Sequence, residues 1–263
     1  MSTVVFLGGG RITSAMLAGL RLNRSKDRLI VHDRNARKMR QLQRRYRAIP
    51  EANLHRAVER ADLLILAVRP ESVKELLNTI GDIDRPLLAI SVAAGVPLQL
   101  LQKYLGPPVR WARAMPSPVC RSGRGLTGLT FPRTLPAIDR KRARDFFSCF
   151  GQVVEIPETK FDAFTVTYSS SHGYHALATL AKAARKLGLD RPTALLAAAH
   201  ALADGITAWR EGEHSLQSLL NEAATPGGIA STTIAAMDAA GYPRAVRKGL
   251  QAGLNRARAN ARK

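Results

Sequence analysis

The stretch VVFLGGGRIT, residues 4–13, decides the fold, because an apolar run, three glycines and a helical pattern follow one another directly. A strand, a G-x-G-x-x-G turn and a helix form a dinucleotide site, since the glycines let the pyrophosphate approach the helix N-terminus. Here Gly8 and Gly10 hold the first two glycine positions and Thr13 the third. A second apolar run ends at Asp33, 23 residues beyond Gly10, as the motif requires. An ordinary tight strand–helix turn is the alternative. We predict a dinucleotide site on Gly8, Gly10, Arg11 and Ile12.

Apolar runs alternate with helical patterns through the first half of the chain. The expected strands are Thr3–Leu7, Leu29–His32, Leu63–Ala67, Leu87–Val92, Val109–Ala114 and Gly128–Phe131, with a further extended run over residues 151–158. The expected helices are Ile12–Leu22, Ala36–Tyr46, Asn53–Ala61, Ser72–Ile80 and Asp139–Phe150. This rhythm predicts right-handed crossovers between parallel strands. The predicted fold class is α/β, with a Rossmann-type doubly wound parallel sheet over residues 1–157.

The sequence changes character after Thr159, where β-branched runs almost disappear and alanines become frequent. Apolar residues recur at helical spacing from Tyr174 to Leu187, and Gly188 ends that helix. A second helix follows, and then two more that TPGG (225–228) and residues 241–243 separate. Helices that are apolar on most sides must be buried against something. We therefore predict an all-α dimerisation domain over residues 158–263, whose core a second copy of the chain completes.

Charge and cysteine content exclude several classes of protein. Lys and Arg number 40 against 20 Asp and Glu, a formal charge of +20. This charge indicates either a solvated basic surface or a field that attracts phosphorylated cofactors, acidic metabolites or nucleic acid. Because the charges do not interleave with aromatic residues, we do not expect a nucleic-acid partner. Two cysteines without Cys-x-x-Cys spacing predict no metal site and no disulfide framework. Without an 18-residue apolar run or a signal peptide, we expect no membrane contact and a cytoplasmic location.

The identity of the dinucleotide depends on the end of the second strand. Asp33 suits the ribose hydroxyls of NAD, but Arg34, Arg37 and Lys38 follow at once. A guanidinium at this place can clamp a 2′-phosphate. A solvated helix start explains the same cations. We favour NADP(H) and keep NAD(H) open.

The chain resembles the pyrroline-5-carboxylate reductase family from end to end. The matching segments are FLGGGRITSAMLAGL (6–20), ADLLILAVRPESV (61–73), ISVAAGV (90–96), RAMPSPVCRSGRG (113–125), ETKFDAFT (158–165) and TPGG (225–228). The resemblance implies a Rossmann domain followed by a helical domain like the C-terminal domain of 6-phosphogluconate dehydrogenase. Such chains form homodimers by interleaving helices, and larger oligomers from those dimers. The implied reaction is hydride transfer from NAD(P)H to the C=N carbon of a cyclic imino acid, which yields proline.

The resemblance also assigns roles to the strand ends of the first domain. The cofactor would contact the segment Ala67, Val68, Arg69 and Pro70, the turn that contains Ala93 and Gly95, and a loop with Met115 and Pro116 beneath the nicotinamide. Ser117 replaces the family's asparagine beside the substrate, and its hydroxyl cannot supply a side-chain amide contact in the same way.

Two departures from the family pattern lie in the helical half. The family's Gly-Ser-Gly-Pro-Ala-Tyr is SSSHGY (169–174) here, and the Thr-Thr after Pro-Gly-Gly is Ile229-Ala230. Serines before a helix can cap it and bind an anion, and His172 can protonate an imine nitrogen near neutral pH. A capping or interface histidine without a catalytic part is the alternative. The catalytic candidates are His172, Ser170, Ser171 and Thr225, and the substrate candidates are Ser117, Gly227, Gly228, Ser231 and Thr232.

The sequence thus predicts an NAD(P)H-dependent oxidoreductase of the pyrroline-5-carboxylate reductase type, in proline biosynthesis or on an altered imine. A non-catalytic dinucleotide-binding protein with a drifted substrate pocket is the alternative, because Ile229-Ala230 lacks the hydroxyls.

Overall fold

The computed structural model describes residues 1–261, which its contacts divide into two compact units. The first unit contains Met1–Tyr168 together with the residues from Ala252 onward, and the second contains Ser169–Gln251.

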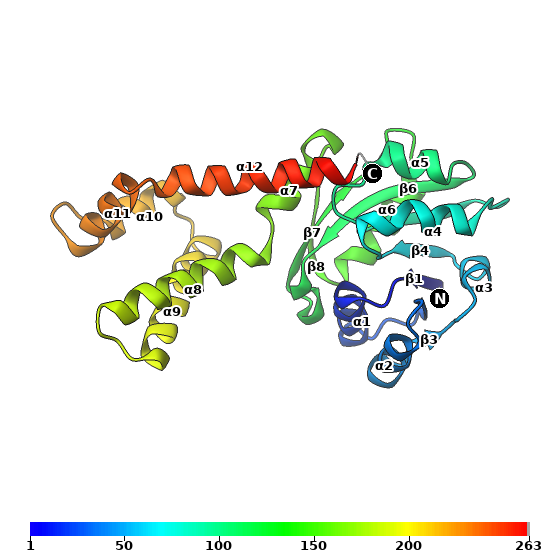
Figure 1. The fold of residues 1–263 in the computed structure, drawn as a ribbon, viewed down its shortest axis with the longest axis horizontal. Coiled ribbons are helices and arrows are strands. Elements are labelled where there is room, and N and C mark those ends of the chain that lie inside the picture. The colour runs from blue at the N-terminus through cyan, green and yellow to red at the C-terminus, as the bar shows by residue number, and fades with distance from the viewer. Residues whose placement is uncertain (262–263) are drawn as a thin grey trace. The chain divides into compact units, whose positions relative to one another are not determined.

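The first unit is built on one eight-stranded sheet (Figure 1). Its strands are β1 (Thr3–Leu7), β2 (Arg28–His32), β3 (Ile49–Pro50), β4 (Leu63–Leu66), β5 (Leu87–Ser91), β6 (Val109–Pro116), β7 (Gly125–Thr130) and β8 (Gly151–Glu155). Their order is β3-β2-β1-β4-β5-β6-β7-β8. The first six strands of this order pair in parallel, which is the strand order of a Rossmann fold. The predicted fold class is therefore confirmed.

Successive residues of a strand point to opposite faces of the sheet. Both faces are apolar here, and helices cover each of them. On β1, Val4 and Phe6 face a core made with α1 (Arg11–Leu22), α2 (Ala36–Tyr46) and α6 (Ala137–Ser148). On the same strand, Val5 and Leu7 face a second core made with α3 (Leu54–Glu59), α4 (Val73–Ile80) and α5 (Leu98–Tyr104). The unit also contains the short 3-10 helices η1 (Pro70–Ser72) and η2 (Pro118–Ser122), the helix α7 (Glu158–Thr167) and the last part of α12 (Tyr242–Asn260).

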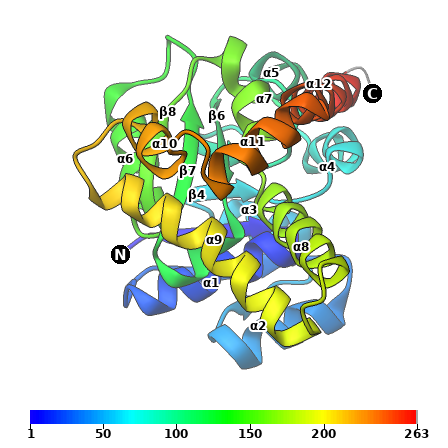
Figure 2. The same ribbon diagram turned by 90° about the vertical axis from the view of Figure 1, so that its left-hand side faces the viewer.

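The second unit is entirely helical in its described residues. It contains α8 (Ser170–Lys186), α9 (Arg191–Glu211), α10 (Leu216–Ala223), α11 (Ile229–Ala239) and the first part of α12 (Tyr242–Asn260). The helices α8 and α9 lie side by side, as Figure 2 also shows, because only a short turn at Gly188 joins them. Of the described residues in α8, α10 and α11, none is buried.

Two features differ from the sequence prediction. The strands β7 and β8 run opposite to the other six, since β6 and β7 pair as antiparallel neighbours. The strand β3 and the helix α5 were not predicted, because two residues and seven residues give too little periodicity to detect. The contacts place α7 in the first unit, where its Phe161 is fully buried, and divide the described chain after Tyr168.

Candidate active site

The parallel strands of the first unit end at a common level. Cα register pairs Leu7 with both His32 and Leu66, Leu66 with Ser91, and Ser91 with Arg113. Every candidate cofactor residue of this unit follows one of these strands or ends one. The chain reverses its direction of winding between β1 and β4, so the crevice at a topological switch point lies beyond these ends. The structure thus brings the predicted cofactor residues to one edge of the sheet.

The glycine turn after β1 has a packed glycine and an open one. Gly8 has a φ of +108°, and a Cβ there would lie 2.5 Å from the carbonyl oxygen of Ala67. Gly10 is the N-cap residue of α1, and a Cβ on it would meet nothing within 4 Å. No side chain caps the first N–H groups of α1, and the space beside Gly10 is open. This cradle fits a diphosphate, whose charge the helix N-terminus stabilises.

Thr13, at the position of the third glycine, holds the turn and the helix together. Its buried Oγ1 donates a 2.6 Å hydrogen bond to the carbonyl of Gly8. The third glycine of the motif serves close packing of helix and strand. Here a hydrogen bond replaces that glycine, which explains why the departure from the motif leaves the turn intact. Arg11 is exposed and Ile12 half-buried in the same first turn of α1.

Asp33 braces the glycine turn from the end of β2. Its Oδ2 accepts a 2.7 Å hydrogen bond from the N–H of Gly9, and its Oδ1 accepts one of 2.8 Å from Asn35. Nζ of Lys38 lies 3.8 Å from Oδ2. Arg34 and Arg37 remain exposed beside it. Both carboxylate oxygens thus already serve the fold, while the guanidinium groups of Arg34 and Arg37 lie at the surface, where Arg34 forms an exposed ion pair of 3.6 Å with Glu75.

The segment after β4 packs directly on the glycine turn. The N–H of Ala67 continues the ladder with a 2.8 Å bond to the carbonyl of Leu7. The side chain of Val68 would lie 3.2 Å from a Cβ on Gly8. Arg69 is exposed and precedes Pro70, which begins η1. The residues from Ala67 to Pro70 therefore lie beside the glycine turn at the carboxyl ends of the parallel strands.

Met115 and Pro116 belong to a strand and not to the predicted loop. They end β6 and pair with Gly128 and Thr127 of β7. Ser117 follows and is buried, and its hydroxyl accepts a 3.1 Å hydrogen bond from the N–H of Val119. That hydroxyl therefore caps η2. The strand pairing fixes the backbone of Met115 more firmly than a loop would.

The candidate residues of α8 lie in the second unit. Ser170 begins the helix, and the hydroxyl of the preceding Ser169 lies 2.6 Å from that of Ser171 instead of capping the helix. Ser171 and His172 are exposed. The first turn of α8 therefore presents backbone N–H groups and hydroxyls together, an arrangement that suits a carboxylate.

The TPGG turn precedes α11 in the same unit. The N–H of Gly228 donates a 3.0 Å hydrogen bond to the carbonyl of Thr225, and Gly227 has a φ of +75°. The hydroxyls of Ser231 and Thr232 both donate to the carbonyl of Gly228, at 2.9 and 3.0 Å. Each of these hydroxyls thus has a backbone partner at the N-cap of its own helix. Ile229, at the first helical position, is 89% exposed.

Comparisons with known proteins identify the family. A family model described as NADP oxidoreductase, coenzyme F420-dependent, matches residues 3–95, and one described as pyrroline-5-carboxylate reductase dimerisation matches residues 158–260. A pyrroline-5-carboxylate reductase of Methanosarcina acetivorans is 31% identical over 188 residues, which cover 70% of this chain and 69% of that one. The chain belongs to the pyrroline-5-carboxylate reductase family.

Solved structures agree with membership of the pyrroline-5-carboxylate reductase family. The enzyme of Coxiella burnetii is 26% identical and superposes with a TM-score of 0.87, covering 99% of this chain and 98% of that one. A Plasmodium falciparum pyrroline carboxylate reductase with NADP bound shares the fold at 20% identity, with a TM-score of 0.86 and the same coverage.

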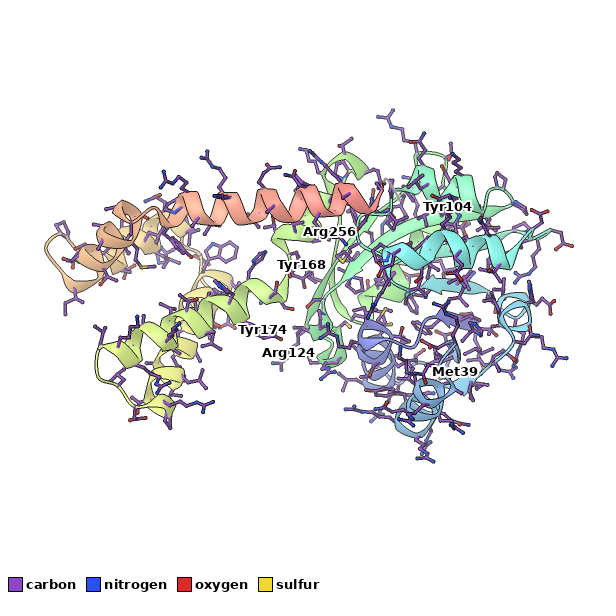
Figure 3. All side chains as sticks on the ribbon, viewed as in Figure 1. Met39, Tyr104, Arg124, Tyr168, Tyr174 and Arg256 are labelled. Carbon is purple, nitrogen blue, oxygen red and sulfur yellow. The ribbon has the colours of Figure 1, made fainter. Side chains whose placement is uncertain are left out.

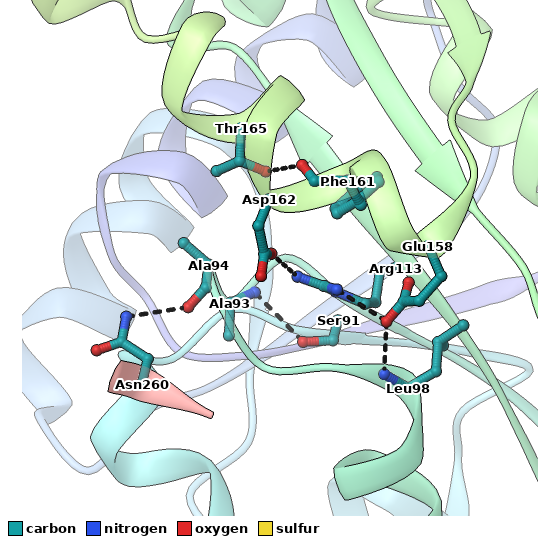
Figure 4. A network of polar contacts seen from close by, with 10 residues as sticks. All are labelled: Ser91, Ala93, Ala94, Leu98, Arg113, Glu158, Phe161, Asp162, Thr165 and Asn260. Atoms are coloured by element: carbon teal, nitrogen blue, oxygen red, sulfur yellow. Dashed lines mark hydrogen bonds and ion pairs between the residues drawn. The ribbon is translucent and has the colours of Figure 1, made fainter. Parts of the chain in front are cut away.

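Sequence reasoning missed an ionic network behind the strand ends of this reductase-family fold. The buried guanidinium of Arg113 lies 2.9 Å from Oε1 of Glu158 and 2.8 Å from Oδ1 of Asp162, both on α7 (Figure 4). It also lies 4.6 Å from the centre of the Phe161 ring. The signal was present as an arginine inside an apolar strand and two acids one helical turn apart. Nothing local paired the strand with that helix.

Three further observations concern metal ligands, helix length and the thiol of Cys120 in residues 1–261. The described side chains include no group of three His, Cys, Asp or Glu suited to a metal. None of the described helices has the length and apolarity that crossing a bilayer requires. Burial raises the pKa of the Cys120 thiol from 9.0 to about 12, so this cysteine is a protonated core residue at neutral pH.

Proposed function

We propose that this protein is an NAD(P)H-dependent reductase that acts on the C=N bond of a cyclic imino acid, with pyrroline-5-carboxylate as the leading substrate and proline as its product. The proposal rests on membership of the family together with one geometric observation. The open cradle at Gly10 lies at the switch point of a Rossmann sheet, beside strand ends that carry the family's segments.

The proposed cofactor residues lie at the carboxyl ends of the parallel strands. Backbone N–H groups at Gly10, Arg11 and Ile12 would hold the diphosphate, while Gly8 lets the turn pack against Ala67. A reduced nicotinamide supplies the hydride when it is bound. The chain's own part is to orient it, which we assign to the segment from Ala67 to Pro70, the turn with Ala93 and Gly95, and the strand end at Met115 and Pro116.

The preference for NADP(H) rests on charge at the adenosine end. Asp33 already accepts hydrogen bonds from Gly9 and Asn35, whereas Arg34 and Arg37 are exposed beside it. A guanidinium recognises a phosphate by paired, charge-assisted hydrogen bonds. The related enzyme of Plasmodium falciparum was solved with NADP bound.

The second unit would supply the substrate contacts. Imine reduction needs an anchored carboxylate, an oriented C=N bond and a proton for the nitrogen. The first turn of α8, with Ser170 and Ser171, is our candidate for the carboxylate, and His172 for the proton. We assign the turn from Thr225 to Gly228 to the same substrate. Ser231, Thr232 and Ser117 were also candidates, and their hydroxyls already serve the backbone.

We further propose a homodimer, because the second unit leaves many large apolar side chains exposed. Tyr174 of α8, labelled in Figure 3, is 67% exposed. Trp209 of α9 is 48% exposed. The family model over residues 158–260 is described as a dimerisation domain. The two free cysteines agree with the cytoplasmic location that we propose.

Turnover of a defined imine tests the reaction. Purified protein should oxidise NADPH when pyrroline-5-carboxylate is added, with one proline formed for each NADPH consumed. His172→Gln should lower kcat at least about 100-fold with little change in the KM for NADPH, as expected for loss of a general acid. His214→Gln is the matched control, since His214 is exposed in the same unit. Equal rates for the two variants would remove His172 from the mechanism.

A non-catalytic dinucleotide-binding protein is the second candidate. It is favoured by Ile229 at the first position of α11 and by the engagement of the next hydroxyls with the carbonyl of Gly228. It predicts NADPH binding without turnover on any of a panel of cyclic imines. Turnover of an imine other than pyrroline-5-carboxylate would keep the class of reaction and change the substrate.

A further inference from the structure

The turn between β5 and α5 is held by residues that are distant in the sequence. Nδ2 of Asn260, near the end of α12, donates a 3.2 Å hydrogen bond to the carbonyl of Ala94 (Figure 4). Oε1 of Glu158 on α7 accepts one of 3.0 Å from the N–H of Leu98. Within the turn, Oγ of Ser91 accepts a 3.3 Å bond from the N–H of Ala93. All these groups belong to the first unit.

The contact between α12 and the turn leaves no spare room. Gly95 has a φ of +73°, and a Cβ on it would collide with the carbonyl of Ala257 on α12. Ala257 itself is buried. The end of α12 and the turn therefore fit together only because position 95 is a glycine. The fit places the amide of Asn260 beside Ala94.

The hydrogen bond from Asn260 fixes one peptide plane. A carbonyl oxygen can only accept, so the amide nitrogen of Asn260 must face it. The peptide between Ala94 and Gly95 is trans, so its N–H points opposite to its carbonyl and away from Asn260. That N–H belongs to Gly95, and among residues 1–261 it has no hydrogen-bond partner.

Without a tether, this peptide would be prone to flip. A φ of +73° at Gly95 suits the second central position of a type II turn. Types I and II differ mainly in the orientation of the central peptide, and glycine adopts either conformation at low cost. The amide orientation of Asn260 in this structure matches one peptide orientation only, because a flipped peptide would turn an N–H toward its NH₂ group and the side-chain amide would have to turn over to offer its oxygen instead.

We propose that Asn260 is a positioning residue for the cofactor, which locks the Ala94–Gly95 peptide so that the N–H of Gly95 is presented to the bound dinucleotide. This inference rests on the proposed function. The turn follows β5, on the opposite side of β1 from β2 and Asp33. The N–H of Gly95 therefore serves the nicotinamide half of the cofactor and not the adenosine half.

Ligand binding to three variants tests this role. Asn260→Asp keeps the size and loses the donor, Asn260→Gln keeps a donor, and Arg258→Ala is the control at an exposed position of the same helix end. Dissociation constants for NADPH, NADH and adenosine 2′,5′-bisphosphate are measured by fluorescence and calorimetry. Thermal unfolding of each variant is followed in parallel.

We expect Asn260→Asp to weaken NADPH and NADH alike, by about 10-fold, as for the loss of one ligand hydrogen bond. Adenosine 2′,5′-bisphosphate should bind within about twofold of wild type, Asn260→Gln should recover part of the loss, and Arg258→Ala should behave as wild type. A lower unfolding temperature with unchanged NADPH affinity, or equal losses for both halves of the cofactor, would overturn the role of Asn260. Wild-type protein that binds neither NADPH nor NADH would instead overturn the proposed function, and this inference with it.

Discussion

Single residues at the glycine turn divide the tasks of folding and binding. Gly8 is fixed by its φ of +108° and by the carbonyl of Ala67, so its role is in the fold. Gly10 has ordinary extended angles, φ −79° and ψ −171°, and free space around it. Any small residue could adopt that backbone. The fold does not require glycine at position 10, and close approach of a ligand to the backbone explains it.

Alanine substitutions should separate these two tasks. Gly8→Ala should lower the free energy of unfolding by about 2 kcal/mol, because alanine is strained at a positive φ and its methyl group would clash with the carbonyl of Ala67. Gly10→Ala should leave stability within about 0.5 kcal/mol of wild type and weaken NADPH at least about 10-fold, because the methyl group takes the place of phosphate. Urea unfolding and fluorescence titration measure the two effects. Unchanged NADPH affinity in Gly10→Ala would show that the diphosphate does not lie at Gly10.

At the scale of elements, α7 is joined to β6 by buried charge. The side chain of Arg113 is 2% exposed and pairs with both Glu158 and Asp162. Removing one partner of such a cluster leaves the other charges buried without compensation, which costs more than the pair itself contributes. Exposed pairs contribute little, because water screens them. The network therefore anchors α7 to β6, the strand that ends at Pro116.

Replacing the buried cation should therefore lower the free energy of unfolding far more than replacing an exposed cation. Arg113→Met should lower the free energy of unfolding by about 3–5 kcal/mol. Lys141→Met removes the same charge from an i,i+4 pair with Asp145 on α6, where Lys141 is 69% exposed, and should cost less than about 0.5 kcal/mol. Denaturant unfolding of both variants makes the comparison. Equal effects would mean that the Arg113 network does not bear on stability.

For the whole molecule, the decisive feature of the second unit is a row of exposed apolar side chains on α9. Along α9, Leu195, Ile206 and Trp209 recur at helical spacing, and each is about half exposed, at 49, 55 and 48%. Exposed apolar stripes of this kind mark interfaces between chains. With a formal charge of +20, copies repel one another at long range, so burial of apolar surface must supply the attraction.

The assembly should depend on that stripe. Wild-type protein should sediment as a dimer or a multiple of dimers, and Ile206→Asp should shift it toward the monomer, because a carboxylate cannot be buried unpaired in an apolar interface. Thr207→Asp adds the same charge at the next exposed position, off the stripe, and should retain the dimer. Analytical ultracentrifugation at physiological salt gives the masses. Monomeric wild-type protein would contradict the homodimer.

The sequence by itself determined every strand but β3, most helices and the glycine turn. These depend on signals within one short segment: apolar runs of β-branched residues, helical spacing, and glycines where the backbone must bend. The same local signals led to Gly8, Gly10 and Asp33, and the family's motifs led to the strand ends around them. The positions of Ser170–His172 and of the TPGG turn at helix starts also followed from sequence.

Only the tertiary structure decided which distant residues meet. It decided the reversed direction of β7 and β8 and the packing of α7 against the first unit. It also paired Arg113 with Asp162 and Asn260 with Ala94, which lie 49 and 166 positions apart in the sequence. The sequence around Asn260 has the pattern of the end of a basic helix, and no local signal in it predicts a contact with Ala94. The hydroxyl directions of Ser117, Ser231 and Thr232 likewise depend on the backbone that each helix presents. Such contacts are set by how whole elements pack, because a side chain's partner is chosen by space and not by sequence distance.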